Sequence, residues 1–240
     1  MHTGNLSKDH RRTALITGAS RGLGLALARA LAGRGWRLVI DARGASALEA
    51  AREELAAMTE VAAIAGSVAD PRHRSEIAEV AGEWGGVDAV INNASILGPS
   101  PQPNLLEYPL ATLADVYHTN VIAPLAMVQA LRASLRPGAT IINVTSDAGV
   151  EPYAGWGGYG SSKAALEQLS AILAAEEPDL RVYWVDPGDM RTQMHQEAFP
   201  GDDISDRLPP ETSVPGFLVL LEERPASGRY IARALAEVAL

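Results

Sequence analysis

The chain has 240 residues, of which 47% are hydrophobic, and a formal net charge of -9. This length suits one well-buried core, so we expect a single catalytic domain over residues 13–240, after a flexible tail over residues 1–12. The absence of cysteine excludes disulfides and thiolate chemistry, and the five histidines show no metal-ligand spacing, so no metal is expected. The acidic balance argues against a nucleic-acid partner. No stretch suits a membrane span or a signal peptide, which predicts a soluble, cytoplasmic protein.

A tyrosine and a lysine stand four residues apart at the start of a strongly helical run, as Tyr159-Gly160-Ser161-Ser162-Lys163. Four residues make about one helical turn, so both side chains share a face. A nearby ammonium favours the phenolate, which predicts a lowered pKa for Tyr159 and a usable proton donor. Such pairs are also common as ordinary surface contacts. The neighbouring Ser146 adds weight, because it follows an apolar run over residues 140–144 and so stands at the end of a predicted strand.

The N-terminal segment predicts a strand, a glycine turn and a helix. Residues 13–17 are apolar, and leucine and alanine recur at helical spacing over residues 23–31. Gly18 suits the tight turn, Gly22 lets the backbone approach a pyrophosphate, and Gly24 opens a helix whose N-terminal amides attract phosphate. Taken alone, these glycines fit an ordinary turn equally well.

Together these motifs resemble the short-chain dehydrogenase/reductase superfamily. The Asn-Asn-Ala sequence after the apolar strand at 87–91 and the Pro-Gly turn at 187–188, with Thr192 four residues after the glycine, add to the resemblance. It covers nearly the whole chain. The resemblance implies an α/β fold of the Rossmann type, with a doubly wound, mostly parallel sheet of seven strands and helices on both faces.

The resemblance also implies a catalytic tetrad of Asn120, Ser146, Tyr159 and Lys163. Ser146 is expected to polarise the substrate oxygen, and Tyr159 to donate the proton. Lys163 is expected to lower the tyrosine pKa and to bind the nicotinamide ribose. Asn120 is expected to anchor a relay water through its backbone carbonyl, which Pro124 leaves free because proline has no N–H to donate. The alternative is an ordinary proline kink with Asn120 facing solvent.

The strand over residues 37–43 carries the position that selects the cofactor. Arg43 at its end suits the 2′-phosphate of NADP, and so does Arg21 in the glycine turn. The acid that selects NAD in the resembled family would stand at Ala42, whereas Asp41 should point to the opposite side. We therefore expect NADPH/NADP, with NAD as the alternative if Asp41 reaches the ribose. The resemblance implies cofactor contacts at Gly18, Ser20, Arg21, Gly22, Leu23, Gly24, Arg43, Ser67, Val68, Asn92, Ala94, Tyr159, Lys163, Pro187, Gly188, Met190 and Thr192.

Further elements follow from periodicity and turn residues. Helices are expected over residues 45–59, 71–84, 113–135, 161–176 and 232–240, and strands over 61–65, 87–91, 141–146, 180–185 and 227–231. Asp70 is expected to cap the second of these helices. Residues 189–213 are expected to form a substrate lid. Ser67 and Ser95 depart from the family, which usually has an aspartate near the adenine and a glycine after Asn-Asn-Ala. The apolar surface of helix 161–176 is consistent with a homodimer or homotetramer.

We expect an enzyme that transfers a hydride from NADPH to a ketone or aldehyde, with Tyr159 as the general acid. One alternative is an NAD-dependent alcohol dehydrogenase of the same fold. The other is a binding protein that senses the redox state of its nucleotide without turnover, although the presence of Tyr159 and Lys163 argues against it. The substrate is expected to be a small carbonyl or alcohol compound. The apolar Trp156 and Met194 and the acidic Asp147 near the site do not identify it.

Overall fold

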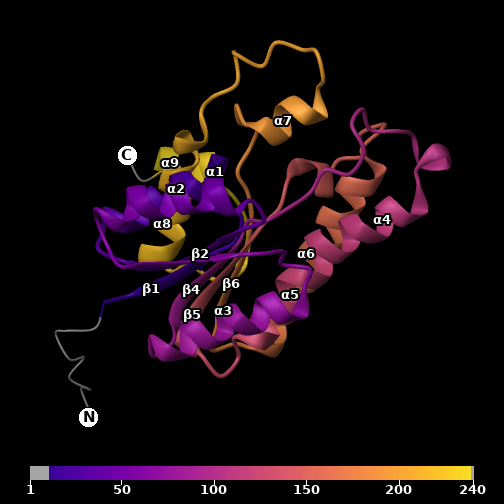
Figure 1. The fold of residues 1–240 in the computed structure, drawn as a ribbon. Helices are drawn as coiled ribbons and strands as arrows, with labels where there is room; N and C mark the ends of the chain where they lie inside the picture. Colours follow the sequence, from indigo (N-terminus) through magenta and orange to yellow (C-terminus); the bar gives the residue numbers. More distant parts are fainter. Residues whose placement is uncertain (1–10, 239–240) are drawn as a thin grey trace.

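The computed structural model describes residues 11–238, which form a seven-stranded sheet between two layers of helices (Figure 1). All strand pairs are parallel, and the strand order is β3-β2-β1-β4-β5-β6-β7. This confirms the expected Rossmann-type α/β fold. The strands are β1 (Thr13–Ile16), β2 (Arg37–Ala42), β3 (Val61–Ala65), β4 (Val87–Asn92), β5 (Leu135–Val144), β6 (Arg181–Asp186) and β7 (Gly228–Ile231).

The two faces of the sheet are covered by different helices (Figure 1). One layer holds α1 (Gly22–Ala32), α2 (Ala45–Ala56), α8 (Val214–Glu222) and α9 (Ala232–Val238), and the other holds α3 (Pro71–Glu83), α5 (Ala123–Ala130) and α6 (Gly157–Glu176). Successive strand residues serve opposite layers. Ile16 belongs to the same core cluster as Phe217 of α8, whereas Leu15 belongs to the cluster of Ile77 of α3. Both faces are therefore apolar, as a buried parallel sheet requires.

The strand order reverses at β1, which pairs with β2 on one side and with β4 on the other. In open α/β sheets, ligands bind at this reversal, outside the carboxyl ends of the strands. The glycine turn follows β1, and the Asn-Asn-Ala turn follows β4. Ser146 and Pro187 follow the ends of β5 and β6 on the same edge. The fold thus collects the sequence motifs along one edge of the sheet.

The helix expected over residues 113–135 is wrong in its bounds. The structure has α4 (Leu110–Tyr117), one π-helical turn (His118–Ile122) and then α5, which ends at Ala130. The wider turn immediately precedes Pro124, whose missing N–H disrupts regular α-helical bonding. The strand expected over 141–146 also shifts, since β5 begins at Leu135 and ends at Val144. Gly138 there has φ 74°, and the β4–β5 register is irregular, which hid the strand start in the sequence.

The helix carrying Tyr159 begins at Gly157, before the expected start at residue 161. Gly157 and Gly158 suggested a loop, but they are needed for close packing. A Cβ at Gly158 would lie 2.2 Å from the hydroxyl oxygen of Tyr108, which no packed structure allows. The sequence also missed α8. By contrast, the Asp70 cap of α3 is confirmed, because its side chain accepts a hydrogen bond from the backbone N–H of Arg72 at 2.9 Å.

The remaining elements match more closely. β3 and α9 form as expected, although α2 ends at Ala56 instead of continuing to residue 59. The segment 189–213 carries α7 (Gln193–Ala198) and a short 3-10 turn, Pro210–Thr212. Residues 1–10 of the expected tail and residues 239–240 of the expected last helix lie outside the described residues. Within residues 11–238, no helix has the length and apolarity that a membrane span requires.

Candidate active site

The glycine turn between β1 and α1 is shaped by two close approaches. Gly18 has φ 66°, and a Cβ there would lie 3.0 Å from the Cα of Ala94. At Gly24, a Cβ would lie 2.4 Å from the carbonyl oxygen of Gly18. α1 then begins at Gly22 with no side-chain cap on its first N–H groups. Free amides and a positive helix end make this turn a fitting cradle for a dinucleotide pyrophosphate.

Asp41 at the end of β2 supports this turn from behind. Its side chain is 1% exposed, and its Oδ1 accepts a hydrogen bond from the backbone N–H of Gly18 at 2.8 Å. Its Oδ2 pairs with Nε2 of the buried His73 at 2.9 Å. Asp41 therefore points toward α3, on the side of the sheet opposite to Ala42, as strand alternation predicted. Both of its carboxylate oxygens are bound within the protein.

The two arginines expected near a 2′-phosphate lie on the surface beside the glycine turn. Arg43 directly follows β2 and is exposed. Arg21 is also exposed, and its guanidinium donates to the side-chain oxygen of Gln193 on α7. Ser67 is half-buried, and its hydroxyl accepts from the N–H of Ala69 at 3.3 Å. The structure thus leaves one cation in the glycine turn, one after the end of β2, and no free carboxylate from Asp41.

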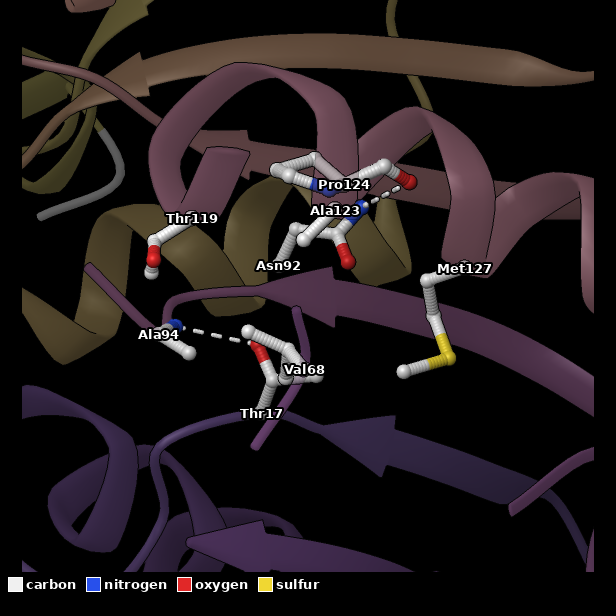
Figure 2. Close-up of a pocket in the computed structure, with 8 residues that line it drawn as sticks. All are labelled: Thr17, Val68, Asn92, Ala94, Thr119, Ala123, Pro124 and Met127. Carbon is white, nitrogen blue, oxygen red and sulfur yellow. Dashed lines mark hydrogen bonds between the residues drawn. The ribbon is translucent and has the colours of Figure 1, made fainter. Parts of the chain in front are cut away.

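The Asn-Asn-Ala turn is tied to the glycine turn. The amide of Asn93 donates to the carbonyl of Thr17 at 2.9 Å, and the N–H of Ala94 donates to the Thr17 hydroxyl at 3.0 Å. The second bond is drawn in Figure 2, beside a narrow space between the ends of β1 and β4 and helix α5. Asn92 instead donates to Asn143 at 2.8 Å and to Pro124 at 3.4 Å. These bonds join β4 to β5 and to α5, and the side chain is 4% exposed. The expected cofactor contact at Asn92 stays a prediction.

Tyr159, Lys163 and Ser146 meet at the start of α6. The hydroxyls of Ser146 and Ser95 lie close enough to the Tyr159 hydroxyl to lower its pKa. The Lys163 ammonium lies 5.3 Å from the centre of the Tyr159 ring and donates to the carbonyl of Val144 at 2.8 Å. Tyr159 is 9% exposed and Lys163 only 2%. The sequence-predicted residues are therefore brought together, in a largely buried setting.

Burial governs the ionisation of this pair. It raises the pKa of Tyr159 well above its ordinary value, and the charges of Asp186 and Asp147 raise it further. Interactions with Ser146 and Ser95 lower that pKa, but by less. Burial also lowers the pKa of Lys163 to about 7. The pKa of Tyr159 is therefore raised, whereas the sequence predicted a lowered one, because burial disfavours the charged phenolate.

The Ser146 hydroxyl has a partner on its exposed side. It donates to Oδ1 of Asp147 at 2.8 Å and accepts from the N–H of Ala148 at 3.2 Å. The other oxygen of Asp147 accepts from the hydroxyl of Tyr153 at 3.0 Å. Asp147 and Tyr153 are both exposed, so this acidic group lies at the mouth of the site.

Asn120 lies in the π-helical turn and is 1% exposed, which rules out the alternative in which it faces solvent. Its Oδ1 accepts from the N–H of Ile96 at 2.9 Å and from the hydroxyl of Ser95 at 3.1 Å. Its Nδ2 donates to the carbonyl of Ile96 at 2.9 Å and to the hydroxyl of Ser162 at 3.0 Å. Asn120 thus fastens the loop after β4 to helix α6. The expected role of its backbone carbonyl stays a prediction.

The Pro-Gly turn after β6 closes the other side of the site. The Gly188 N–H donates to Oδ1 of Asp186 at 2.8 Å, and the Ser213 hydroxyl donates to the carbonyl of Pro187 at 2.7 Å. A Cβ at Gly22 would lie 3.6 Å from the Cγ2 of Thr192, so this segment faces the glycine turn.

The segment 189–213 packs over Tyr159 through apolar side chains. Met194 and Ala198 pack against the small cluster that contains Tyr159. The ring of Trp156 lies 5.8 Å from that of Tyr159 and 5.8 Å from that of Phe199. Met190 packs against the main core instead. The expected role of this segment as a substrate lid stays a prediction.

One charged group near the site has no signature in the sequence. Arg229 of β7 donates to Glu167 of α6 at 3.0 Å, and its guanidinium lies 3.5 Å from Asp186. The role of His73, which is 4% exposed against Asp41, was also missed. No local pattern marks these partners, since 62 residues separate Arg229 from Glu167.

Comparisons with known proteins agree with this geometry. Residues 12–203 match the family model described as short chain dehydrogenase. Mouse sepiapterin reductase is 33% identical over 199 residues, covering 77% of this chain and 76% of its own. Benzil reductase ((S)-benzoin forming) from Saccharomyces cerevisiae is 30% identical, covering 85% and 79%. A short-chain dehydrogenase structure from Shigella flexneri, complexed with NADP, superimposes with a TM-score of 0.82 at 27% identity, covering 92% and 97%.

Proposed function

This chain belongs to the short-chain dehydrogenase/reductase family of NAD(P)-dependent oxidoreductases acting on CH–OH and C=O groups, and we propose that it reduces a ketone or aldehyde with NADPH. The observation that carries the choice of NADPH is the pairing of Asp41. Both of its carboxylate oxygens are bound, one by the Gly18 N–H and one by His73. Selection of NAD by an acid at the ribose would need one of them free. Arg21 and Arg43, both exposed beside the turn, suit the added 2′-phosphate.

The direction of the reaction follows from the tyrosine. Burial raises the pKa of Tyr159, so the phenol keeps its proton at neutral pH. A protonated phenol is the form that donates to a carbonyl oxygen receiving a hydride, whereas alcohol oxidation needs the phenolate as base. Ser146 would hydrogen-bond the same carbonyl oxygen. Lys163 would bind the ribose hydroxyls beside the nicotinamide. The bound dinucleotide supplies the hydride, and the protein supplies orientation and the proton.

The substrate class is a small, largely apolar carbonyl compound. Trp156 and Met194 pack against the Tyr159 cluster, Phe199 packs on Trp156, and α7 would act as the lid over this apolar surface. Asp147 at the mouth disfavours anionic substrates. Two relatives are named for reduction of sepiapterin and of benzil, so both compounds are reasonable first substrates to test.

We also propose a homo-oligomer formed by the face of α4, α5 and α6. Leu110 of α4 is 77% exposed and Ile172 of α6 is 43% exposed, and the short turns that flank α4 add the exposed Leu106 and Ile122. Large aliphatic side chains gathered on one face favour association with a second copy. Light scattering after gel filtration distinguishes a dimer or tetramer from a monomer, and a monomer at micromolar concentration contradicts this part of the proposal.

A nucleotide titration tests the cofactor without knowledge of the substrate. NADPH and NADH are titrated into purified protein, and the nucleotide fluorescence is followed. We expect tighter binding of NADPH, and a loss of this preference in Arg43→Ala and Arg21→Ala. Arg132→Ala is the matched control, because Arg132 is exposed on the surface and its nearest carboxylate, Glu177, is 4.0 Å away. A preference for NADH in the unmodified protein contradicts the proposal.

A further inference from the structure

Ser95 places an additional hydroxyl beside the reacting tyrosine. It follows the Asn-Asn-Ala turn after β4, at the position where the resembled family usually has glycine. Its side chain is half-buried, and its hydroxyl donates to Oδ1 of Asn120 at 3.1 Å. The same hydroxyl interacts with that of Tyr159. A glycine at this position could do neither.

Ser95 is tied by a chain of hydrogen bonds to the helix that carries Tyr159. Its partner Asn120 cannot move freely, because Asn120 also binds both backbone groups of Ile96. Asn120 donates in turn to Ser162, whose hydroxyl donates to the backbone carbonyl of Tyr159 at 2.6 Å. This chain of bonds holds the Ser95 oxygen in place relative to helix α6, on which Tyr159 stands. A fixed donor needs little reorganisation during a reaction, which is the condition for useful stabilisation of charge.

We propose that Ser95 is a catalytic residue that donates a hydrogen bond to the Tyr159 oxygen as this tyrosine gives its proton to the substrate, a role that rests on the proposed carbonyl reduction. Before the transfer, the Ser95 hydroxyl donates to Asn120. During the transfer, the Tyr159 O–H bond breaks and an O–H bond forms on the reduced substrate. Ser95 then turns its hydrogen from Asn120 to the phenolate, and no bond to Ser95 is made or broken.

The neighbouring polar groups are less suited to donate this hydrogen bond to the Tyr159 oxygen. Lys163 donates a hydrogen bond to the carbonyl of Val144, and burial disfavours its charged form. Ser146 is engaged with Asp147 and, in the proposed reaction, with the substrate oxygen. Asn120 tolerates the loss of the Ser95 hydrogen, because its Oδ1 keeps the bond from the Ile96 N–H. Ser95 is thus the hydroxyl that can turn without leaving a buried acceptor unpaired.

The test compares Ser95→Gly, Ser95→Ala and Ser95→Thr for reduction of benzil and sepiapterin by NADPH. A hydrogen bond to a charged group corresponds to about a ten- to hundredfold effect, so we expect kcat of the first two variants to fall by that factor. Ser95→Thr, which keeps a hydroxyl, should recover most of the rate. The solvent deuterium isotope effect on kcat should increase in Ser95→Gly, because proton transfer from Tyr159 becomes slower. Ser75→Ala, which removes an exposed hydroxyl on α3, is the control.

Two outcomes overturn the proposal. One is a Ser95→Gly variant with unchanged kcat and isotope effect. The other is a loss of kcat that is matched by weaker NADPH binding and a lower melting temperature, with the isotope effect unchanged, since that pattern marks a packing residue.

A second measurement needs no turnover and separates this proposal from a failure of the proposed function. The protein is labelled with [13Cζ]tyrosine and saturated with NADP, and the Tyr159 resonance is assigned by its loss in Tyr159→Phe. We expect this resonance to shift in Ser95→Gly and to stay in place in Ser75→Ala. If no carbonyl compound is reduced but the resonance shifts, the contact stands and the substrate choice fails. An unshifted resonance contradicts the role of Ser95 whatever the activity.

Discussion

Lys163 donates its hydrogen bond to the carbonyl oxygen of Val144 at 2.8 Å, in a site that leaves the lysine 2% exposed. The Lys163 amine is therefore bound to the end of β5, whereas the sequence spacing predicted that it acts on Tyr159. The cost of burying the ammonium then falls on the stability of the fold, which makes it measurable.

The stability of the protein should respond to pH through Lys163. Burial lowers its pKa to about 7 from the ordinary 10.5, so between these values the unfolded chain binds more protons than the folded one. The free energy of unfolding should therefore rise with pH over this window, relative to a variant without the amine. Urea unfolding of the unmodified protein and Lys163→Met is compared at pH 7 and pH 9.5. Tyr159→Phe is the control, and a difference between protein and variant that stays constant with pH contradicts the prediction.

Removal of the Asp41 carboxylate should weaken the binding of NADPH and of NADH by similar amounts. Asp41→Ala leaves the Gly18 N–H and the His73 ring without their buried partner. We expect a loss of about 2 kcal/mol in the free energy of unfolding, and a similar weakening of NADPH and NADH binding. Asp41→Asn, which keeps an acceptor for Gly18, should lose less. A selective loss of NADH binding would instead mean that Asp41 binds the ribose.

Gly24→Ala should abolish nucleotide binding. The added methyl group would lie 2.4 Å from the Gly18 carbonyl oxygen and 2.6 Å from the Asn93 amide nitrogen, so the turn must open. Gly44→Ala is the matched control, because a Cβ there meets nothing within 4 Å. Fluorescence titration of both variants with NADPH checks the prediction. Equal affinities in the two variants would show that the turn has room to adapt.

Arg229 should stabilise the fold mainly at neutral pH. Arg229→Met leaves Glu167 and Asp186, both largely buried, as neighbouring carboxylates without their cation. We expect the free energy of unfolding to fall by about 2 kcal/mol at pH 7. Burial raises the pKa of Asp186, so acid should protonate it early and reduce the penalty at pH 4.5. Urea unfolding at the two pH values measures this. An equal loss at both would assign the effect to packing of the side chain.

The fold was predicted from a family resemblance that short local motifs carry. The apolar strands and the glycines after β1 predicted the sheet and its binding edge, because each depends on residues close in the chain. The bounds near Gly138 and Gly158 were missed, since glycine there serves an irregular strand and a close contact with Tyr108 rather than a loop.

The electrostatics of the site could not be predicted in the same way. The spacing of Tyr159 and Lys163 gave their shared face correctly, but desolvation depends on everything packed around them. Likewise, the partner of Asp41 is 32 residues away on α3, and no periodicity points to it. Contacts of this kind follow from the folded arrangement and have no local signature.

The most direct test of the account is deuterium transfer from [4-2H]NADPH to a carbonyl substrate, with benzil as the first compound. Mass spectrometry of the alcohol product should find deuterium on the former carbonyl carbon. Tyr159→Phe should slow the reaction at least about a hundredfold, because the proton donor is lost, while NADPH affinity stays nearly unchanged. Tyr230→Phe, which loses only a hydrogen bond to the carbonyl of Ala226, should keep its rate. Deuterated alcohol formed by Tyr159→Phe at the unmodified rate would contradict the central claim.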